Sequence, residues 1–291
     1  MIVINSLVEL QEQLTAAKTQ GRQIVLVPTM GALHEGHLSL VEIATAQPDA
    51  FVVLSIFVNP TQFGKNEDFD KYPRTLPEDI ARLEELSVTP DVIFTPQVSE
   101  VYSEGIPERL EPRAGAIGSV FEGAARPGHF DGMLHIVSWF FRTVQPAIAV
   151  FGAKDAQQLY LIRRMVHREF ADSITILEGK TIREESGLAK SSRNRFLSSE
   201  GLASASRIIQ ILRTVEAEIG AGQTPDAALD KARMALTGLS LAKLDYLELV
   251  DKSTFKPIAD TFSGEALLLV AVILDGVRLI DNITLNIQEP A

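Results

Sequence analysis

The two histidines His34 and His37 are the first residues along the chain whose spacing could support chemistry. They lie in the stretch VPTMGALHEGHLSL, residues 27–40, separated by a glutamate and a glycine. A zinc metalloprotease helix carries H-E-x-x-H, with its histidines four positions apart on one face. Here they are three apart, Gly36 stands where a helix former belongs, the other histidines are far along the chain, and Cys is absent. The pattern therefore argues against a zinc hydrolase and excludes thiolate ligands.

The residues flanking the histidines predict a strand, a loop and a helix. Residues 23–28, QIVLVP, form an apolar run typical of a buried parallel strand. TMGAL follows as a loop of small residues, and Leu38, Val41 and Ala44 then recur at helical spacing. Open α/β sheets bind ligands at such turns, and helix N-termini favour anions. Neutral imidazoles there could each donate a hydrogen bond to a phosphate; alternatively, both histidines only cap the helix.

Two further stretches follow expected strands and carry polar side chains. In residues 57–75, FVNPTQFGKNEDFDKYPRT, Asn59 and Gln62 are placed to hydrogen-bond a small polar substrate, and Tyr72 to close over it. In FGAKDAQQL, residues 151–159, Gly152 permits close backbone approach. Three side chains after it could serve phosphate, ribose and substrate in turn: Lys154, Asp155 and Gln158. The ordinary alternatives are a surface turn and a helix capped by Asp155.

The stretch KSSRNRFLS, which begins at Lys190, resembles a phosphate clamp. Two hydroxyl groups lie between Lys190 and Arg193, and arginine can bind phosphate through two parallel hydrogen bonds. A Ser/Arg-rich loop can also be a plain linker, so this loop alone is weak support. Together with a histidine loop at a strand-to-helix turn, it favours nucleotide binding.

Composition narrows the classes of protein. The 291 residues suffice for one large or two modest domains, and 46% hydrophobic residues suffice for a core. A net charge of −11 argues against nucleic acid as the main partner. No N-terminal signal peptide is evident, and the longest apolar run, Ala266–Leu274, is about half a membrane span. Without Cys there are no disulfides, which fits a cytoplasmic location.

Alternating patterns predict the architecture. Strands are expected at 23–28, 50–60, 90–96 and 147–152, and helices at 37–46, 78–86, 132–144 and from Asp155. This order favours an α/β, Rossmann-like, doubly wound parallel sheet over residues 1–180. Residues 181–291 predict a smaller α+β domain with helices at 199–220 and 224–236. Antiparallel strands follow there, joined by an Asp275–Gly276 hairpin turn.

These four stretches, in this order, resemble the class I nucleotidyltransferases, in which H-x-G-H and K-M-S-K-S-like loops clamp ATP. Within that superfamily the chain is most similar to the pantothenate synthetase (pantoate–β-alanine ligase) family, from about residue 23 to 200. The resemblance implies that pantoate attacks the α-phosphate of Mg-ATP, giving pantoyl adenylate and pyrophosphate. β-Alanine then displaces AMP to give pantothenate. It also implies a cytoplasmic homodimer whose C-terminal domain is a lid carrying the KSSR loop.

The resemblance assigns roles by position. His34, His37, Lys154 and Arg193 would stabilise the reacting phosphates, with His37 donating to the developing charge. Asn59, Gln62, Tyr72 and Gln158 would bind pantoate and β-alanine, with Arg126 and His129 as weaker candidates. ATP would contact Met30, Gly31, Ala32, Leu33, His34, Glu35, Gly36, His37, Gly152, Ala153, Lys154, Asp155, Ile182, Lys190, Ser191, Ser192 and Arg193.

The chain departs from the family pattern at three positions. Ala153 stands where Glu is common, Ala156 where an aromatic residue is common, and Lys190 where Met or Leu is usual. The extra charge of Lys190 should strengthen ATP binding if it points inward. For Mg²⁺, Glu78 and Asp79 are possible ligands, although ATP and water can hold the ion.

Three alternatives stay open at this point. An adenylyltransferase would stop after nucleotide transfer and need no second small substrate. A metallohydrolase would lose activity to a chelator and ignore ATP. A nucleotide sensor would bind ATP without forming AMP.

Overall fold

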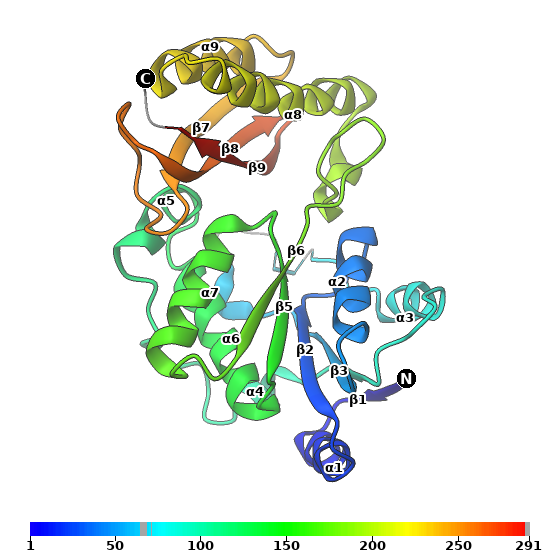
Figure 1. Cartoon of the computed structure of the whole chain (residues 1–291). Coiled ribbons are helices and arrows are strands. Elements are labelled where there is room, and N and C mark those ends of the chain that lie inside the picture. The colour runs from blue at the N-terminus through cyan, green and yellow to red at the C-terminus, as the bar shows by residue number, and fades with distance from the viewer. Residues whose placement is uncertain (65–68, 71, 289–291) are drawn as a thin grey trace. The chain divides into compact units, whose positions relative to one another are not determined.

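The structure, a computed structural model, describes residues 1–64, 69–70 and 72–288 (Figure 1). Its chain divides into two compact units, one of Met1–Ala153 with Gln157–Lys180, the other of Lys154–Ala156 with the chain from Thr181 onward. The predicted loop at residues 57–75, which carries the amide side chains of Asn59 and Gln62, is the amide loop. Its residues 65–68 and 71 lie outside the described residues. Within the described part of the chain, no helix has the length and apolarity needed to cross a membrane.

A six-stranded parallel sheet forms the first unit, in the order β1–β4–β3–β2–β5–β6. Its strands are β1 (Ile2–Ile4), β2 (Gln23–Thr29), β3 (Ala50–Ile56), β4 (Val92–Phe94), β5 (Ile148–Gly152) and β6 (Thr175–Gly179). The direction of winding reverses between the neighbours β2 and β5, and open α/β sheets bind ligands at such a switch point. The predicted α/β class with a doubly wound parallel sheet is confirmed.

Helices cover both faces of this sheet, because successive side chains of a strand point to opposite sides. Ile24 and Leu26 of β2 belong to a core shared with α1 (Leu7–Thr19), α6 (His129–Val144) and α7 (Ala156–Glu169). Val25 and Val27 belong to a second core shared with α2 (Glu35–Thr45) and α3 (Leu76–Glu84). The remaining short helical segments are η1 (Pro60–Gln62), α4 (Val98–Val101), η2 (Gly115–Ser119) and α5 (Glu122–Ala125).

The second unit is an antiparallel sheet with two helices on one face. Strands β7 (Ala242–Asp251), β8 (Gly264–Leu274) and β9 (Val277–Ile287) pair in that order. One apolar core joins this sheet to α8 (Ser199–Gly220) and α9 (Pro225–Thr237), and η3 (Ser192–Phe196) precedes α8. Asp275 and Gly276, with φ of 54° and 76°, form the two-residue turn between β8 and β9. The predicted hairpin is confirmed, since both central residues of this turn type need positive φ.

Elements β1, α1 and β6 are not indicated by the sequence pattern, and several elements begin or end at other residues than expected. β1 has only three residues, too few for a periodic pattern, and β6 is a partly exposed edge strand. The helix expected at 78–86 begins two residues earlier, at Leu76, with Pro77 in its first turn, where proline is tolerated. The strand expected at 50–60 ends at Ile56, because Asn59–Pro60 starts a helical turn.

Candidate active site

The loop between β2 and α2 makes a tight turn at the switch point of the sheet. Gly31 and Ala32 have φ of 77° and 50°, both in the left-handed region. A Cβ at position 31 would lie 2.9 Å from Cγ2 of Ile56 and 3.0 Å from Oδ2 of Asp79, so only glycine fits. The turn brings α2 to its start at Glu35, two residues earlier than expected. Glu35 itself is exposed, with its carboxylate 3.8 Å from Arg82.

The side chain of Asp79, on α3, binds the backbone of this loop. Its side chain is buried, and its two carboxylate oxygens accept from the backbone N–H groups of Ala32 (3.0 Å) and Leu33 (2.7 Å). The N–H of Gly31 donates to Oγ1 of Thr29 at 3.2 Å. The three backbone N–H groups of this turn are therefore paired within the protein. Both oxygens of Asp79 are likewise committed, which argues against the expected role of this residue as a magnesium ligand.

The two histidines cap α2 and fix each other. Nδ1 of His34 accepts from the N–H of Gly36 at 3.1 Å, and Nδ1 of His37 accepts from the N–H of His34 at 3.2 Å. A ring nitrogen that accepts carries no proton, so each neutral imidazole bears its proton on Nε2. The capping alternative is thus observed, and it makes Nε2–H the donor of each ring. Gly36 gives the cap its space, because a Cβ there would lie 2.9 Å from Cε1 of His34.

Asn59 organises the turn η1 after β3. It is 1% exposed, and its Oδ1 accepts from the hydroxyl of Tyr102 (2.7 Å) and from the hydroxyl and N–H of Thr61 (3.0 and 3.3 Å). Its Nδ2 donates to the backbone oxygen of Gly132 (3.0 Å) and to Oε1 of Gln62 (3.3 Å). These bonds use its hydrogen-bonding groups inside the protein. Asn59 thereby positions Gln62, and its contact with β-alanine stays a prediction.

Gln62 joins the amide loop to the histidine loop. Its Nε2 lies 2.8 Å from Sδ of Met30, and its backbone oxygen accepts from Nδ1 of His129 at 2.8 Å. Because Arg126 can only donate, Nε2 of His129, 3.1 Å from its Nη1, acts as the acceptor. The weaker candidates Arg126 and His129 thus lie beside Gln62 and hold its backbone, in agreement with a place in the same site.

Tyr72 belongs to a small aromatic cluster at the end of the amide loop. The rings of Tyr72 and Phe69 both lie edge-on to Phe63, with centroids 5.8 and 5.4 Å from it. Tyr72 is half-buried, and its ring packs against the ring of Phe63.

Two neighbouring glutamines of α7, Gln157 and Gln158, differ in burial and in the roles expected of them. Gln157 is buried, donates to the backbone oxygens of Ile117 and Val120, and accepts from the N–H of Glu122 at 3.1 Å. It therefore ties α7 to the segment from η2 to α5. Gln158, the predicted substrate ligand, is half-buried on the same helix.

The end of β5 carries the second predicted nucleotide segment. Gly152 ends the strand, and the N–H of Ala153 donates to the oxygen of Gly179 on β6 at 2.8 Å. Lys154 is half-buried and Asp155, directly before α7, is exposed. In the second unit, the backbone oxygen of Lys154 accepts from Nδ2 of Asn282 at 2.8 Å.

The KSSR loop, residues 190–193, directly follows a narrow antiparallel turn of the second unit, residues 183–189. The N–H of Lys190 donates to the oxygen of Ile182 at 2.9 Å, and Nζ of Lys190 lies 3.5 Å from the Glu184 carboxylate. Oγ of Ser191 accepts from the N–H of Arg193 at 3.3 Å and so starts η3. Ser192 is half-buried and Arg193 is exposed. The charge of Lys190 is partly balanced by Glu184 rather than wholly available to a ligand.

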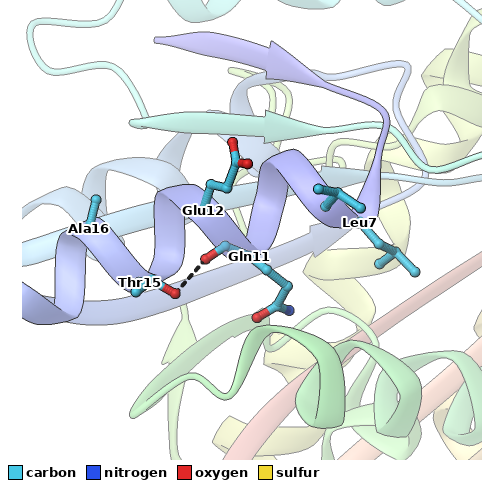
Figure 2. A pocket seen from close by; sticks show the side chains of 6 residues that line it. Leu7, Gln11, Glu12, Thr15 and Ala16 are labelled. Atoms are coloured by element: carbon cyan, nitrogen blue, oxygen red, sulfur yellow. Dashed lines mark hydrogen bonds between the residues drawn. The ribbon is translucent and has the colours of Figure 1, made fainter.

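Possible metal clusters among the described residues, and one surface hollow of the first unit, can be compared with the predicted site. Among the described residues, no group of three or more His, Asp or Glu side chains could hold a metal ion. Figure 2 shows a surface hollow beside α1 whose lining comes from that helix alone. It contains none of the predicted site residues; its lining is Leu7, Val8, Gln11, Glu12, Thr15 and Ala16.

Comparison with known proteins identifies the family. The sequence model of the pantoate–β-alanine ligase family matches residues 2–284. The pantothenate synthetase of Leifsonia xyli subsp. xyli is 46% identical over 267 residues, 92% of this chain and 90% of the relative. The one from Marinobacter nauticus is 43% identical, covering 98% of this chain and all of the relative. This chain belongs to the pantoate–β-alanine ligase family.

Solved structures of the same family share its fold. The pantothenate synthetase of Thermus thermophilus is 41% identical, with a TM-score of 0.88 over 97% of this chain and 99% of that one. The ligase of Francisella tularensis, solved with β,γ-ATP and β-alanine, is 34% identical, with a TM-score of 0.75 over 97% of both chains.

For a pantoate–β-alanine ligase, the residues that sequence reasoning missed are supports rather than ligands. The sequence suggests Asp79 only as a metal ligand and indicates no role for Gln157, Arg183 or Asp281. A signal did exist for Asp79: it lies three residues after Leu76 and four before Leu83, within the apolar stripe of α3. An acidic residue on a buried face needs a partner, and here the partner is the histidine loop.

Proposed function

We propose that this chain condenses pantoate with β-alanine in an ATP-dependent, AMP-forming reaction. A carboxylate oxygen of pantoate attacks the α-phosphorus of ATP, and pyrophosphate leaves. The amine of β-alanine then attacks the acyl carbon of pantoyl adenylate, AMP leaves, and the amine loses a proton. Membership of the family over nearly the full chain carries this proposal.

The histidine loop supplies neutral donors for phosphate oxygens. The caps that fix Nδ1 of His34 and His37 as acceptors orient two Nε2–H groups without adding a full positive charge. Donors held in place stabilise charge that develops in the transition state more effectively than mobile ones. We assign the increase in negative charge on the α-phosphate to His37, with His34 beside it.

The other assignments divide between cations and substrate ligands. Lys154 and Arg193 balance phosphate charge, helped by Lys190, Ser191 and Ser192. Met30 to Leu33, Gly152, Ala153 and Ile182 line the nucleotide, and Asp155 accepts from ribose. The smaller substrates contact Asn59, Gln62, Gln158 and Tyr72. Asn59 and His129 also hold Gln62. Mg²⁺ enters with ATP, because phosphate oxygens and water are ligands that this ion prefers.

A complete reaction tests the proposal. ATP, Mg²⁺, pantoate and β-alanine should yield equal amounts of AMP and pantothenate. Without β-alanine, pantothenate should be absent, and pyrophosphate should appear in an amount close to that of the enzyme, with pantoyl adenylate retained. AMP formation that does not depend on pantoate would refute the assignment.

The same assay separates the alternatives. An adenylyltransferase would release pyrophosphate repeatedly without any amine. A nucleotide sensor would bind ATP and form no AMP. A zinc hydrolase would act without ATP and stop when a zinc-selective chelator is added.

Location and assembly are part of the same proposal, because the family resemblance implies both. We propose a cytoplasmic homodimer, which size-exclusion chromatography with light scattering and cell fractionation would test.

A further inference from the structure

Asp281 is an acidic residue on an apolar face. It lies on β9 between Leu279 and Ile283, which point to the same side, toward the core shared with α8 and α9. It is 7% exposed. Burying a carboxylate is costly unless it is paired, so its partner must be held firmly.

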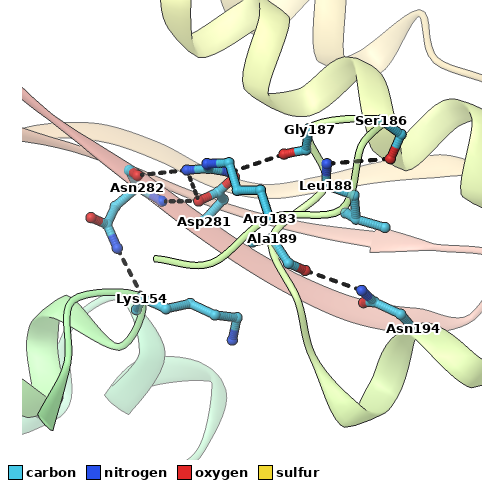
Figure 3. Close-up of polar contacts among 9 residues, drawn as sticks. All are labelled: Lys154, Arg183, Ser186, Gly187, Leu188, Ala189, Asn194, Asp281 and Asn282. Carbon is cyan, nitrogen blue, oxygen red and sulfur yellow. Dashed lines mark hydrogen bonds and ion pairs between the residues drawn. The ribbon is translucent and has the colours of Figure 1, made fainter. Parts of the chain in front are cut away.

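That partner is Arg183, at the start of the turn that leads to the KSSR loop. Its guanidinium donates from Nη1 to Oδ2 of Asp281 at 2.6 Å and from Nη2 to Oδ1 at 3.0 Å, a bidentate pair. The same Nη1 donates to the backbone oxygen of Gly187 at 3.2 Å. Arg183 therefore fastens both limbs of the turn to β9, as Figure 3 shows.

The contacts continue into the KSSR loop. Arg183 and Ala189 face each other in an antiparallel bridge, and the oxygen of Ala189 accepts from Nδ2 of Asn194 at 3.1 Å. Lys190 to Arg193 lie between these two anchored points. The backbone that carries the predicted phosphate ligands is thus held at both ends.

The next residue of β9 holds the other cationic segment. Asn282, 8% exposed, donates from Nδ2 to the backbone oxygen of Lys154 at 2.8 Å. Successive residues of a strand point to opposite sides, so Asp281 and Asn282 reach in two directions. In Figure 3 the Lys154 side chain extends away from this bond, leaving its ammonium group clear of Asn282.

We propose that Asp281 and Asn282 are positioning residues for ATP. Together they fix the spacing between Lys154 and the segment from Lys190 to Arg193, so that both cationic segments contact one triphosphate. This inference rests on the proposed function. Neither residue touches substrate; each acts through the backbone or the guanidinium that it holds.

Single variants break each link. Asp281→Asn removes the charge that grips Arg183, and Asn282→Ala removes the bond to Lys154. Because a misplacement of about 1 Å can cost about a hundredfold in rate, each should raise the KM for ATP and slow adenylate formation by at least about tenfold. The KM for β-alanine should stay near that of the wild type. Pyrophosphate release and amide formation are measured separately.

Two controls separate positioning from stability. Asp245→Asn breaks another ion pair of β9, between Arg278 on this strand and Asp245 on β7. In that pair Nη2 of Arg278 lies 2.6 Å from Oδ2 of Asp245. It should leave the KM for ATP unchanged. The double variant Arg183→Met with Asp281→Leu replaces the ion pair by apolar groups, which often restores stability. Its melting temperature should recover relative to Asp281→Asn, while its affinity for ATP stays low.

The outcomes are decisive in both directions. If the double variant recovers ATP affinity together with stability, or if Asn282→Ala behaves as Asp245→Asn, the inference is wrong. Calorimetric titration with ATP gives the answer even for a wild-type protein that forms no pantothenate. Absence of pantothenate would overturn the proposed function, whereas unchanged ATP binding in Asn282→Ala would overturn only the positioning role.

Discussion

Replacing His37 by Asn or by Gln separates its two tasks. The imidazole accepts from the N–H of His34 through Nδ1 and carries its proton on Nε2. The Oδ1 of asparagine lies close to where Nδ1 was, so His37→Asn keeps the cap and removes the distal donor. The amide nitrogen of glutamine reaches the place of Nε2, so His37→Gln keeps the donor and removes the cap.

The two losses differ in size. An N-terminal cap is worth about 1 kcal/mol, so His37→Gln should lower the free energy of unfolding by about that amount. In a protein of this size that corresponds to a fall of about 3 °C in melting temperature. Loss of an oriented donor to the transition state costs about 3 kcal/mol of barrier, so His37→Asn should turn over at least about a hundredfold more slowly. His37→Gln should keep most of its activity.

Initial rates of AMP formation at saturating substrates, together with thermal melts, measure both effects. His167→Asn is the control, because that histidine lies on α7 with 75% of its side chain exposed, beside Asp172. It should change neither quantity. If His37→Asn is as active as His37→Gln, or if it alone melts early, the assignment of Nδ1 to the cap and Nε2 to phosphate fails.

Three further variants probe other parts of the site. In Asp79→Asn the side-chain NH2 would face one of the two loop N–H groups, so two donors would meet. This should lower the free energy of unfolding, measured with urea, by about 2 kcal/mol and slow adenylate formation. Lys154→Ala should lower turnover about a hundredfold in the AMP assay with an unchanged melting temperature. Burial raises the pKa of Tyr102 above its ordinary 10, so the neutral hydroxyl is favoured in the folded state. Its contribution to stability should be complete below pH 10 and lost as the pH rises through the raised pKa; Tyr102→Phe should remove that alkaline loss in urea titrations.

Local patterns were sufficient to predict much of the fold. The strand at residues 23–28, the loop of small residues and the following helix correspond to β2, the histidine loop and α2. The Asp-Gly pair predicted its own hairpin. These features depend on neighbours in sequence, so period and turn chemistry reveal them.

The supports of the site could not be predicted in the same way, because their partners are remote. Asp79 lies 46 residues from Leu33, and Arg183 lies 98 residues from Asp281. The contacts of Asn59 could not be predicted for the same reason, since its partners Tyr102 and Gly132 lie 43 and 73 residues away. A polar residue in a loop is equally compatible with a ligand contact and with a structural one until its neighbours are known.

Acidic residues that interrupt an apolar pattern nevertheless indicated structural supports of the site. Asp79 breaks the buried stripe of α3, and Asp281 breaks the apolar face of β9; each holds a loop with predicted phosphate ligands. Both carboxylates accept from protein donors, so acidic residues are compatible with the proposed ATP site beside them. Since Asp79 and Thr29 accept from the N–H groups of Gly31 to Leu33, the proposed recognition of phosphate at this loop depends on side chains. The proposed enzyme should therefore be more sensitive to loss of His34, His37 or Lys154 than a glycine-rich loop that binds phosphate through its backbone.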